Sequence, residues 1–280
     1  MANRLILFFM ICATASARGE EKQVAAAERI APAITRFEAG DSTIGDIVAA
    51  INAQGPNRLE LVDPFETDRQ PERRRPEDVA IRVRGEEFDG QTFWSAVQMI
   101  RVATRRRVTP DVDLKGPRRI ILVPASGDRG FVSDDGICLM ELTGAGYSRS
   151  RRFIHGKPLT EAAWPVDPPE RDPGHYAVSL RLWVEPRFSI SGTSSATVVF
   201  AVDDRSRLLT DEKAPSPPGR PEGTHADRAS FHLRLRDPGA PRPKLIHRLE
   251  GFVDLEVTDL TTGAVQKTRA NFAFTDVPLP

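Results

Sequence analysis

Hydrophobic residues recur with two different periods along this chain, and the period changes near residue 130. The first part mixes a helical period with short runs typical of strands. One helix face is predicted from residues at the i, i+3, i+4 and i+7 positions, which are Ile44, Ile47, Val48 and Ile51. Thr43 precedes this face and Asp46 follows three positions later, which predicts an approximate capping box. We therefore expect a helix from Thr43 to a stop at Gly55-Pro56.

A second helix and five short strands complete the pattern of the first part. The helix is expected at about residues 92–104, with a buried stripe of Phe93, Ala96, Val97, Ile100 and Ala103. The strands are expected at 34–38, 59–62, 79–83, 107–109 and 119–123. A polar stretch at 63–78 separates the second and third strands. Its arginines, Arg73 to Arg75, are flanked by acidic residues, which favours a solvated loop over a binding site for an acidic partner.

From about Gly130 onwards the pattern predicts strands alone. The clearest period of two joins Tyr176, Val178, Leu180, Leu182 and Val184, which alternate with Ala177, Ser179, Arg181, Trp183 and Glu185. Further strands are expected at 197–202, 230–236, 245–257 and 269–275. Because antiparallel strands with one apolar face must bury it against a second sheet, the second part is expected to form a β-sandwich. The predicted fold class is α+β.

Both parts of the chain resemble known protein families. The order strand, helix, strand, strand, helix, strand, strand, with Phe93-Trp94 opening the second helix, resembles the short N-terminal (STN) domain found ahead of secretins and TonB-dependent receptors. The second part is similar to secreted bacterial proteins that join such a domain to a β-rich one. The matching segments are LRLWVEPR at 180–187, Asp203-Asp204 leading to Leu208, Leu249-Glu250-Gly251 and FAFTD at 272–276. That group has no known activity, so the resemblance implies no catalytic residues.

The resemblance also bears on the end of the chain. Similar proteins are expected to continue where this chain stops at Pro280. A missing final strand would leave an exposed sheet edge.

The amino terminus has the pattern of an export signal. Arg4 is followed by an apolar core at 5–13, and Ala15-Ser16-Ala17 is a small-residue cleavage site, so cleavage is expected after Ala17. The apolar core is too short for a helix that crosses a bilayer, and no stable membrane span is expected after cleavage. We therefore expect a periplasmic or secreted protein. The expected organisation is signal peptide 1–17, N-terminal linker 18–32, STN-like α+β domain 33–126 and β-sandwich-like domain 127–280.

Charge and cysteine usage narrow the classes of partner. The chain has 39 basic and 39 acidic residues, and the same balance holds between Arg18 and Ser126, so nucleic acid and anionic membrane surfaces are disfavoured. Cys12 leaves with the signal peptide, and a lipid anchor on it is disfavoured by the bulky residues before it. Cys138 then remains alone, which excludes an internal disulfide in the mature chain. Cys138 is interpreted as a small buried hydrophobe.

Histidines and aspartates are the main candidates for chemistry. His225 and Asp227 lie beside Glu222, in a loop where a solvated turn is favoured over a metal site. His247 shares its predicted strand face with Leu245 and Leu249, which predicts a core histidine with one hydrogen-bonded nitrogen. Three aspartate pairs have oxygens suited to calcium but lack the spacing of a calcium loop, so turn formation is favoured: Asp111-x-Asp113, Asp134-Asp135 and Asp203-Asp204.

Other chemistry finds little support in the sequence. Gly144-Ala145-Gly146 lacks the remaining residues of a phosphate-binding loop, and no Gly-x-Ser-x-Gly elbow is present. Trp183 faces away from the apolar side of its strand, which allows either a platform for sugars or packing against a covered face, and packing is favoured. Trp94 is interpreted as helix packing, while Trp164 fits either role.

The sequence therefore predicts an exported, non-enzymatic module of the cell envelope that binds a protein partner or has a structural role, with no cofactor and no metal. Its expected mechanism is the addition of a partner strand at open sheet edges. The alternative is a hydrolase or carbohydrate-binding accessory protein with a cleft built from Asp203, Asp204, His225 and Asp227. A further alternative, a periplasmic assembly partner of an outer-membrane machine, follows from the STN resemblance alone.

Overall fold

The computed structural model describes residues 30–38, 40–62, 80–109, 118–125, 130–148, 153–154, 157–158, 174–210, 221–224 and 226–279. Several sequence predictions lie outside these residues: the signal peptide, Cys12, the polar stretch 63–78, Asp111, Asp113, Trp164 and His225. Among the described residues the chain is mostly β-strand with two α-helices, and most strand pairs are antiparallel. No described helix is long and apolar enough to cross a membrane.

The first part, residues 30–125, contains two helices and two small sheets. In chain order its elements are β1 (Asp41–Thr43), α1 (Ile44–Gln54), β2 (Leu59–Leu61), β3 (Arg82–Arg84), the short 3-10 helix η2 (Gly85–Glu87), α3 (Phe93–Thr104), β4 (Arg106–Thr109) and β5 (Ile120–Pro124). Strands β1 and β3 pair antiparallel. In the other sheet β5 lies in the centre, parallel to β2 and antiparallel to β4.

The predicted cap of helix α1 is confirmed. The Thr43 hydroxyl accepts a hydrogen bond of 3.1 Å from the Asp46 amide, and Asp46 Oδ2 accepts one of 2.9 Å from the Thr43 amide. Both side chains thus satisfy amides that a helix start leaves unpaired. Ile44, Ile47 and Ile51 are buried, as their spacing predicts.

The predicted strand at 34–38 is wrong, because its backbone bonds to other groups. Only Ile34 forms an isolated bridge, with Thr92. The Arg36 amide donates to the side chain of Gln54, and the Phe37 amide donates to the side chain of Asp89. The first paired strand is therefore β1, a few residues later.

The second part, residues 130–279, consists of strands, as predicted, among the residues that the structure describes. They are β6 (Phe131–Asp135), β7 (Cys138–Ser148), β8 (Phe153–Ile154), β9 (Lys157–Pro158), β10 (His175–Val184), β11 (Phe188–Thr193), β12 (Thr197–Asp203), β13 (Pro221–Thr224), β14 (Arg228–Arg236), β15 (Leu245–Asp259) and β16 (Val265–Pro278). One sheet has the order β13-β14-β10-β7-β6. In the other, β15 pairs with β11 and β12 on one side and with β16 on the other.

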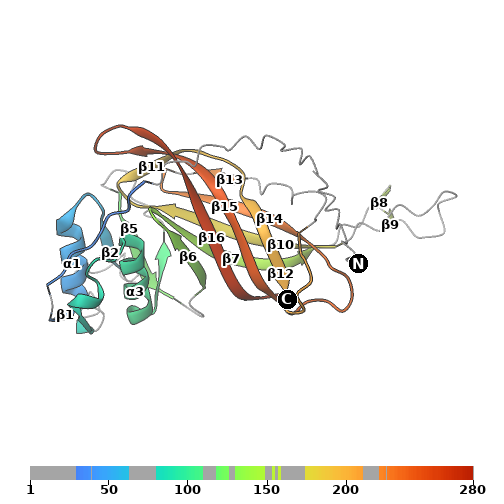
Figure 1. The fold of residues 1–280 in the computed structure, drawn as a ribbon, viewed down its shortest axis with the longest axis horizontal. Helices are drawn as coiled ribbons and strands as arrows, with labels where there is room; N and C mark the ends of the chain where they lie inside the picture. Colours follow the sequence, from blue (N-terminus) through green and yellow to red (C-terminus); the bar gives the residue numbers. More distant parts are fainter. Residues whose placement is uncertain are drawn as a thin grey trace, which may run out of the picture.

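The two large sheets share one hydrophobic core. Its buried residues come from alternating positions of both sheets, for example Val178, Leu180 and Leu182 of β10 and Leu249 and Val253 of β15. A separate core lies in the first part and is built around α1, α3 and β5. Figure 1 shows the two helices beside one end of the long strands. The two cores are distinct, but the second includes residues of both parts of the chain.

Leu139 and Trp183 are the residues that connect the parts. Their neighbours along β7 and β10 face the core between the large sheets, whereas Leu139 and Trp183 face the opposite way and belong to the core of the first part. Trp183 is fully buried there. The preferred prediction of packing is confirmed, and a sugar-binding platform is excluded because the first part covers this face of the sheet.

The core position predicted for His247 is wrong. On the β12 side, Val202 pairs with Arg248 and Asp203 pairs with Ile246, so the register between β12 and β15 shifts at His247. Such an irregularity reverses the faces of the residues that follow it. The His247 side chain is 60% exposed, and its Nδ1 lies 2.8 Å from Oδ1 of Asp276.

Candidate functional site

The structure does not gather the predicted acidic cluster into one cleft. Asp203 and Asp204 lie at the end of β12, and Asp204 donates its amide to the Leu245 carbonyl. Asp227 precedes β14, and its carbonyl accepts the Val184 amide at the end of β10. The far end of β14 is the one next to β12, because the Arg236 amide donates to Leu209, whose own amide donates to Ala201.

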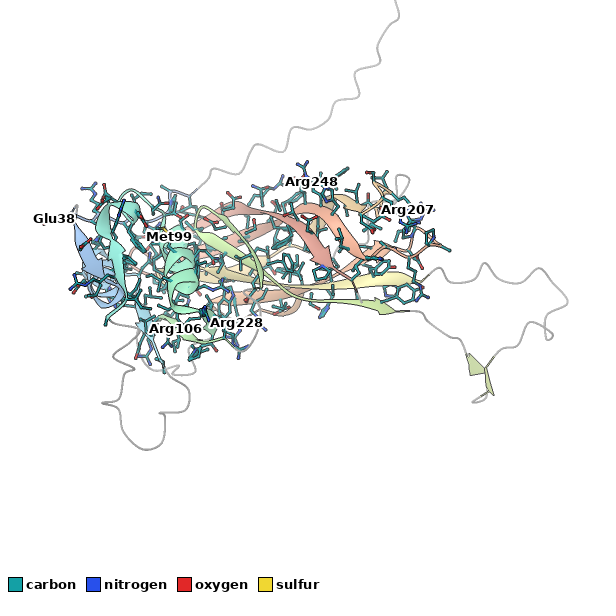
Figure 2. All side chains as sticks on the ribbon, turned by 90° about the horizontal axis from the view of Figure 1, so that it is seen from below. Glu38, Met99, Arg106, Arg207, Arg228 and Arg248 are labelled. Carbon is teal, nitrogen blue, oxygen red and sulfur yellow. The ribbon has the colours of Figure 1, made fainter. Side chains whose placement is uncertain are left out.

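Asp203 and Asp227 are therefore separated by about the length of β14, roughly 30 Å at 3.4 Å per residue. Figure 2 shows the same arrangement, with Arg207, the partner of Asp203, and Arg228, the neighbour of Asp227, well apart along the molecule. This distance counts against the alternative of a hydrolase or carbohydrate-binding cleft that uses both aspartates.

Asp203 forms a turn instead. Its carboxylate is buried and accepts bonds of 2.8 Å from the amides of Arg205 and Arg207 and of 2.7 Å from Arg207 Nε. Burial by itself raises the pKa of Asp203, but these hydrogen bonds and the Arg207 charge outweigh it, so the pKa is lowered. The favoured interpretation as a turn-forming aspartate is confirmed.

The described residues contain neither a metal-binding cluster nor a reactive cysteine. No group of three or more His, Cys, Asp or Glu side chains lies within reach of one ion in that part of the chain. Cys138 is buried, and burial raises the pKa of its thiol, as expected for a small hydrophobe rather than a nucleophile. Asp135 accepts bonds of 2.8 and 2.6 Å from the amide and side chain of Asn271, so it links two strands.

Glu185 is a buried residue that sequence reasoning missed. It is fully buried where β10 ends, and it accepts hydrogen bonds of 3.0 Å from the Ala33 amide, 3.0 Å from Asn57 Nδ2 and 2.7 Å from Arg187 Nε. Asn57 in turn accepts a 3.1 Å bond from the Arg187 amide. Burial raises the pKa of Glu185, although the Arg187 charge and the donated bonds oppose this. The cluster joins the two parts of the chain, so its role is structural.

Further polar contacts reinforce this junction. Trp94 Nε1 donates a 2.8 Å bond to the Ile137 carbonyl, and Ser95 donates one of 2.9 Å to Asp134. Arg118 donates to the carbonyls of Phe188 and Ala226. The first part is therefore held against the large sheet at several points.

A pocket of about 340 Å³ lies at the same junction. Its lining comes from α3, β4, β7, β10 and the ends of connecting segments, namely Arg101, Arg106, Arg107, Val108, Ala125, Gly130, Glu141, Leu142, Thr143 and Arg181. The basic residues outnumber the single acidic one, so the lining has an excess of positive charge in a chain that is neutral as a whole.

Arg101 and Glu141 form the buried side of the pocket. Arg101 Nη2 lies 3.7 Å from Glu141 Oε1, and their side chains are only 4% and 13% exposed. Burial lowers the pKa of Arg101, and Glu141 opposes this shift. Because a buried guanidinium is costly to desolvate, it favours a negative charge nearby. Arg106 is also buried and donates to the carbonyls of Val62 and Leu122.

Strand β4, which contributes to this pocket, is an edge strand of its sheet. Val108 lies opposite Leu122, whose carbonyl accepts a bond from Val62 on the other side of β5. Val108 and Leu122 therefore form a non-hydrogen-bonded pair, and the backbone N–H and C=O of Val108 point away from β5. The period of two places those of Arg106 on the same outer side. Both residues also line the pocket.

Strand β16, the other long edge, is partly closed by side chains. The Ala273 amide donates to Ser133 Oγ at 3.2 Å, and the Asn271 amide donates to Asp135 at 2.8 Å. These bonds connect β16 to β6 of the facing sheet. A partner strand would have to displace them in the middle of β16. The period of two places the backbone groups of Val265 and Lys267 on the same outer side as those of Asn271, and both residues are exposed. Strand β4 is less open, because Arg106 and Val108 are buried and the Arg106 carbonyl already accepts a bond of 3.4 Å from Arg101 Nε.

No family model, curated protein or solved structure is similar enough to this chain to indicate its family or its function. The pocket and the start of the β16 edge are therefore candidate sites by their geometry alone.

Proposed function

We propose that this chain is an exported, non-enzymatic protein of the cell envelope that recognises an extended segment of a partner protein. The observation that carries the proposal is the start of the β16 edge, where the backbone groups of Val265 and Lys267 point away from β15 and both residues are exposed. An added strand gains main-chain hydrogen bonds from such an edge, while the side chains beside it select the partner.

The domain types expected from the sequence belong to the same proposal. The front domain is proposed to be STN-like, and the order β1, α1, β2, β3, α3, β4, β5 supports this. The rear domain is proposed to be a β-sandwich, supported by two antiparallel sheets with a shared core. The dispersal of Asp203 and Asp227 supports a non-enzymatic role.

Two substitutions at Lys267 test strand addition. Lys267→Pro removes the outward N–H without removing a ladder bond to β15, and Lys267→Ala removes the charged side chain but keeps the N–H. A displayed library of short peptides is first selected on the wild-type chain. The binders should lose affinity with Lys267→Pro and keep it with Lys267→Ala, provided that both variants remain folded by near-UV circular dichroism.

Hydrogen exchange supplies a second measurement that needs no variant. Binding should slow exchange at Val265 and Lys267, whose amides become bonded to the added strand. Peptides that protect only another region, or a selection that yields no binder, would contradict the proposal.

Export is tested separately by fractionation. The protein should be found outside the cytoplasm with Arg18 as its first residue, as determined by mass spectrometry of the intact chain. An uncleaved chain in the cytoplasm would refute the export part of the proposal.

A further inference from the structure

The start of β16 differs from the rest of that strand because it is exposed on both faces. From Thr268 to Phe274, buried positions alternate with less buried ones, as expected for a strand with one face against the core. Before Thr268 the alternation is lost, and three successive residues are exposed, namely Val265, Gln266 and Lys267. Among the described strands, β16 pairs with β15 alone. An added strand can therefore reach the backbone and both faces here.

The length of edge that is open to an added strand is short. The Asn271 amide points outward and already donates to Asp135, so pairing ends before this residue. Outward backbone groups therefore remain at the odd-numbered positions of residues 265–269. The same positions place their side chains on the outer face of the sheet, because Thr268 between them is buried. These side chains are the ones that a partner strand would meet on that face.

Two of the three outer side chains are cations that already have acidic neighbours. Arg269 Nε lies 2.7 Å from Asp254 Oδ1, and its guanidinium lies 3.8 Å from the centre of the Phe252 ring. Lys267 is directly opposite Glu256 of β15, and opposite charges at such positions attract. Because β15 balances both cations, this part of the edge offers a partner little net charge. Selection of the partner by charge is therefore disfavoured.

Val265 is the apolar side chain of this face. It is 59% exposed, and its direct neighbour on β15 is the polar Thr258. Natural proteins commonly protect sheet edges with charges or proline, so an exposed valine at an open edge position favours pairing with another strand. In neighbouring strands, β-branched and aromatic side chains that lie directly opposite each other stabilise the pairing.

We infer that the segment added at β16 carries an uncharged apolar residue, β-branched or aromatic, directly opposite Val265. This inference rests on the proposed function, because the segment is the strand that pairs with the start of β16. It adds the chemistry by which the partner is selected. The contact also sets the register, because a shift by one residue would turn the apolar side chain to the other face.

The experiment uses the full chain and the displayed peptide library. Selected peptides should share a position that is enriched in Val, Ile, Phe, Tyr or Trp. Replacing that residue by Thr should weaken binding about threefold to fivefold, the size expected for one cross-strand pair. Enrichment in Asp or Glu instead would overturn the inference, because Lys267 and Arg269 would then be the selecting residues.

Val265→Thr tests the contact from the other side. Thr keeps the β-branched shape and the backbone N–H but replaces a methyl group by a hydroxyl. This variant should weaken the selected peptides about threefold to fivefold, and it should have little further effect on peptides that already carry Thr at the shared position. Val199→Thr is the matched control and should leave affinity unchanged, because Val199 is a 63% exposed strand valine on β12, across β15 from β16.

The outcomes separate this inference from the proposed function. Binders that protect the Val265 and Lys267 amides without an apolar preference would overturn the inference and leave strand addition in place. Equal responses to Val265→Thr and Val199→Thr would also overturn it. Binders that depend on Val265 but ignore Lys267→Pro would contradict strand addition. Analytical ultracentrifugation tests another occupant, since self-association that Lys267→Pro abolishes would show that a second copy of the chain takes the place of the partner segment.

Discussion

Asn57 Nδ2 donates a 3.0 Å hydrogen bond to Glu185 Oε2, which joins residues 128 positions apart in the chain. Arg187 Nε and the Ala33 amide bond to the same carboxylate. One buried side chain thus holds the amino-terminal segment, the turn after α1 and the end of β10. The junction between the two parts depends on it more than on any exposed ion pair, because exposed pairs are solvated in both states.

Glu185→Ala should lower the free energy of unfolding by about 3 kcal/mol, because it leaves the donors of Asn57 and Ala33 without their buried acceptor. Urea unfolding followed by tryptophan fluorescence measures the change. Glu250→Ala is the matched control, because Glu250 forms a more exposed pair with Arg248, also two residues away. It should cost less than about 1 kcal/mol. Equal losses in the two variants would show that the Glu185 cluster has no special role.

The same carboxyl predicts a dependence of stability on pH. Because burial raises the pKa of Glu185 above that of the unfolded chain, the folded state holds its proton more tightly. Its stabilising contribution is complete below the unfolded value of about 4.3 and is lost as the pH rises through the folded value. The free energy of unfolding of the wild type relative to Glu185→Gln should therefore fall from pH 4 upwards. A difference that rises over this interval would contradict the direction of the shift.

The features that the sequence could predict are those that depend on residues close together in the chain. The Thr43 capping box depends on residues three positions apart, and the strand at 176–184 depends on a period of two, so both are visible in one window. Trp183 and Glu185 share the nominally polar face of that strand. A tryptophan at this position indicates that the face is covered, and the burial of Glu185 could have been inferred from it.

Other features depend on contacts between distant segments. The register shift at His247 involves β12, and no pattern within β15 reveals it. The pocket brings Arg101 of α3 next to Glu141 of β7, which a sequence without homologues does not predict. The sequence allowed the fold to gather Asp203 and Asp227 into one cleft, but they lie near opposite ends of β14.

Gly251 lies where two strands approach closely, and Gly251→Ala tests this packing. An added Cβ would lie 2.1 Å from the Thr197 carbonyl oxygen and 2.4 Å from the Phe272 ring, distances that require the backbone to shift. The substitution should cost about 3 kcal/mol. Gly192→Ala is the control, because Gly192 also pairs with β15 but its added Cβ would be 3.5 Å from Glu256. Its cost should be within about 0.5 kcal/mol, and similar midpoints for both variants in thermal unfolding would contradict the close approach.

Two buried tryptophans in the core of the first part allow one hydrogen bond to be measured. Trp94 and Trp183 are both fully buried in this core. Trp94 Nε1 donates to the Ile137 carbonyl across the junction, whereas Trp183 Nε1 has no hydrogen-bond partner among the described residues. Phenylalanine in either place removes the same volume and the same N–H group, so the costs of the resulting cavities are comparable.

Trp94→Phe should therefore destabilise the chain by about 1–3 kcal/mol more than Trp183→Phe. The former loses a hydrogen bond to the Ile137 carbonyl, which keeps only the Glu185 amide as donor, whereas the latter removes a buried N–H that has no partner among the described residues. Denaturant unfolding of both variants, monitored by far-UV circular dichroism, gives the difference without relying on the altered fluorescence. If Trp183→Phe is the more damaging substitution, packing of the Trp183 ring in the core of the first part outweighs the bond to Ile137. The junction would then be held mainly by apolar contact, and its polar contacts would serve to orient the two parts.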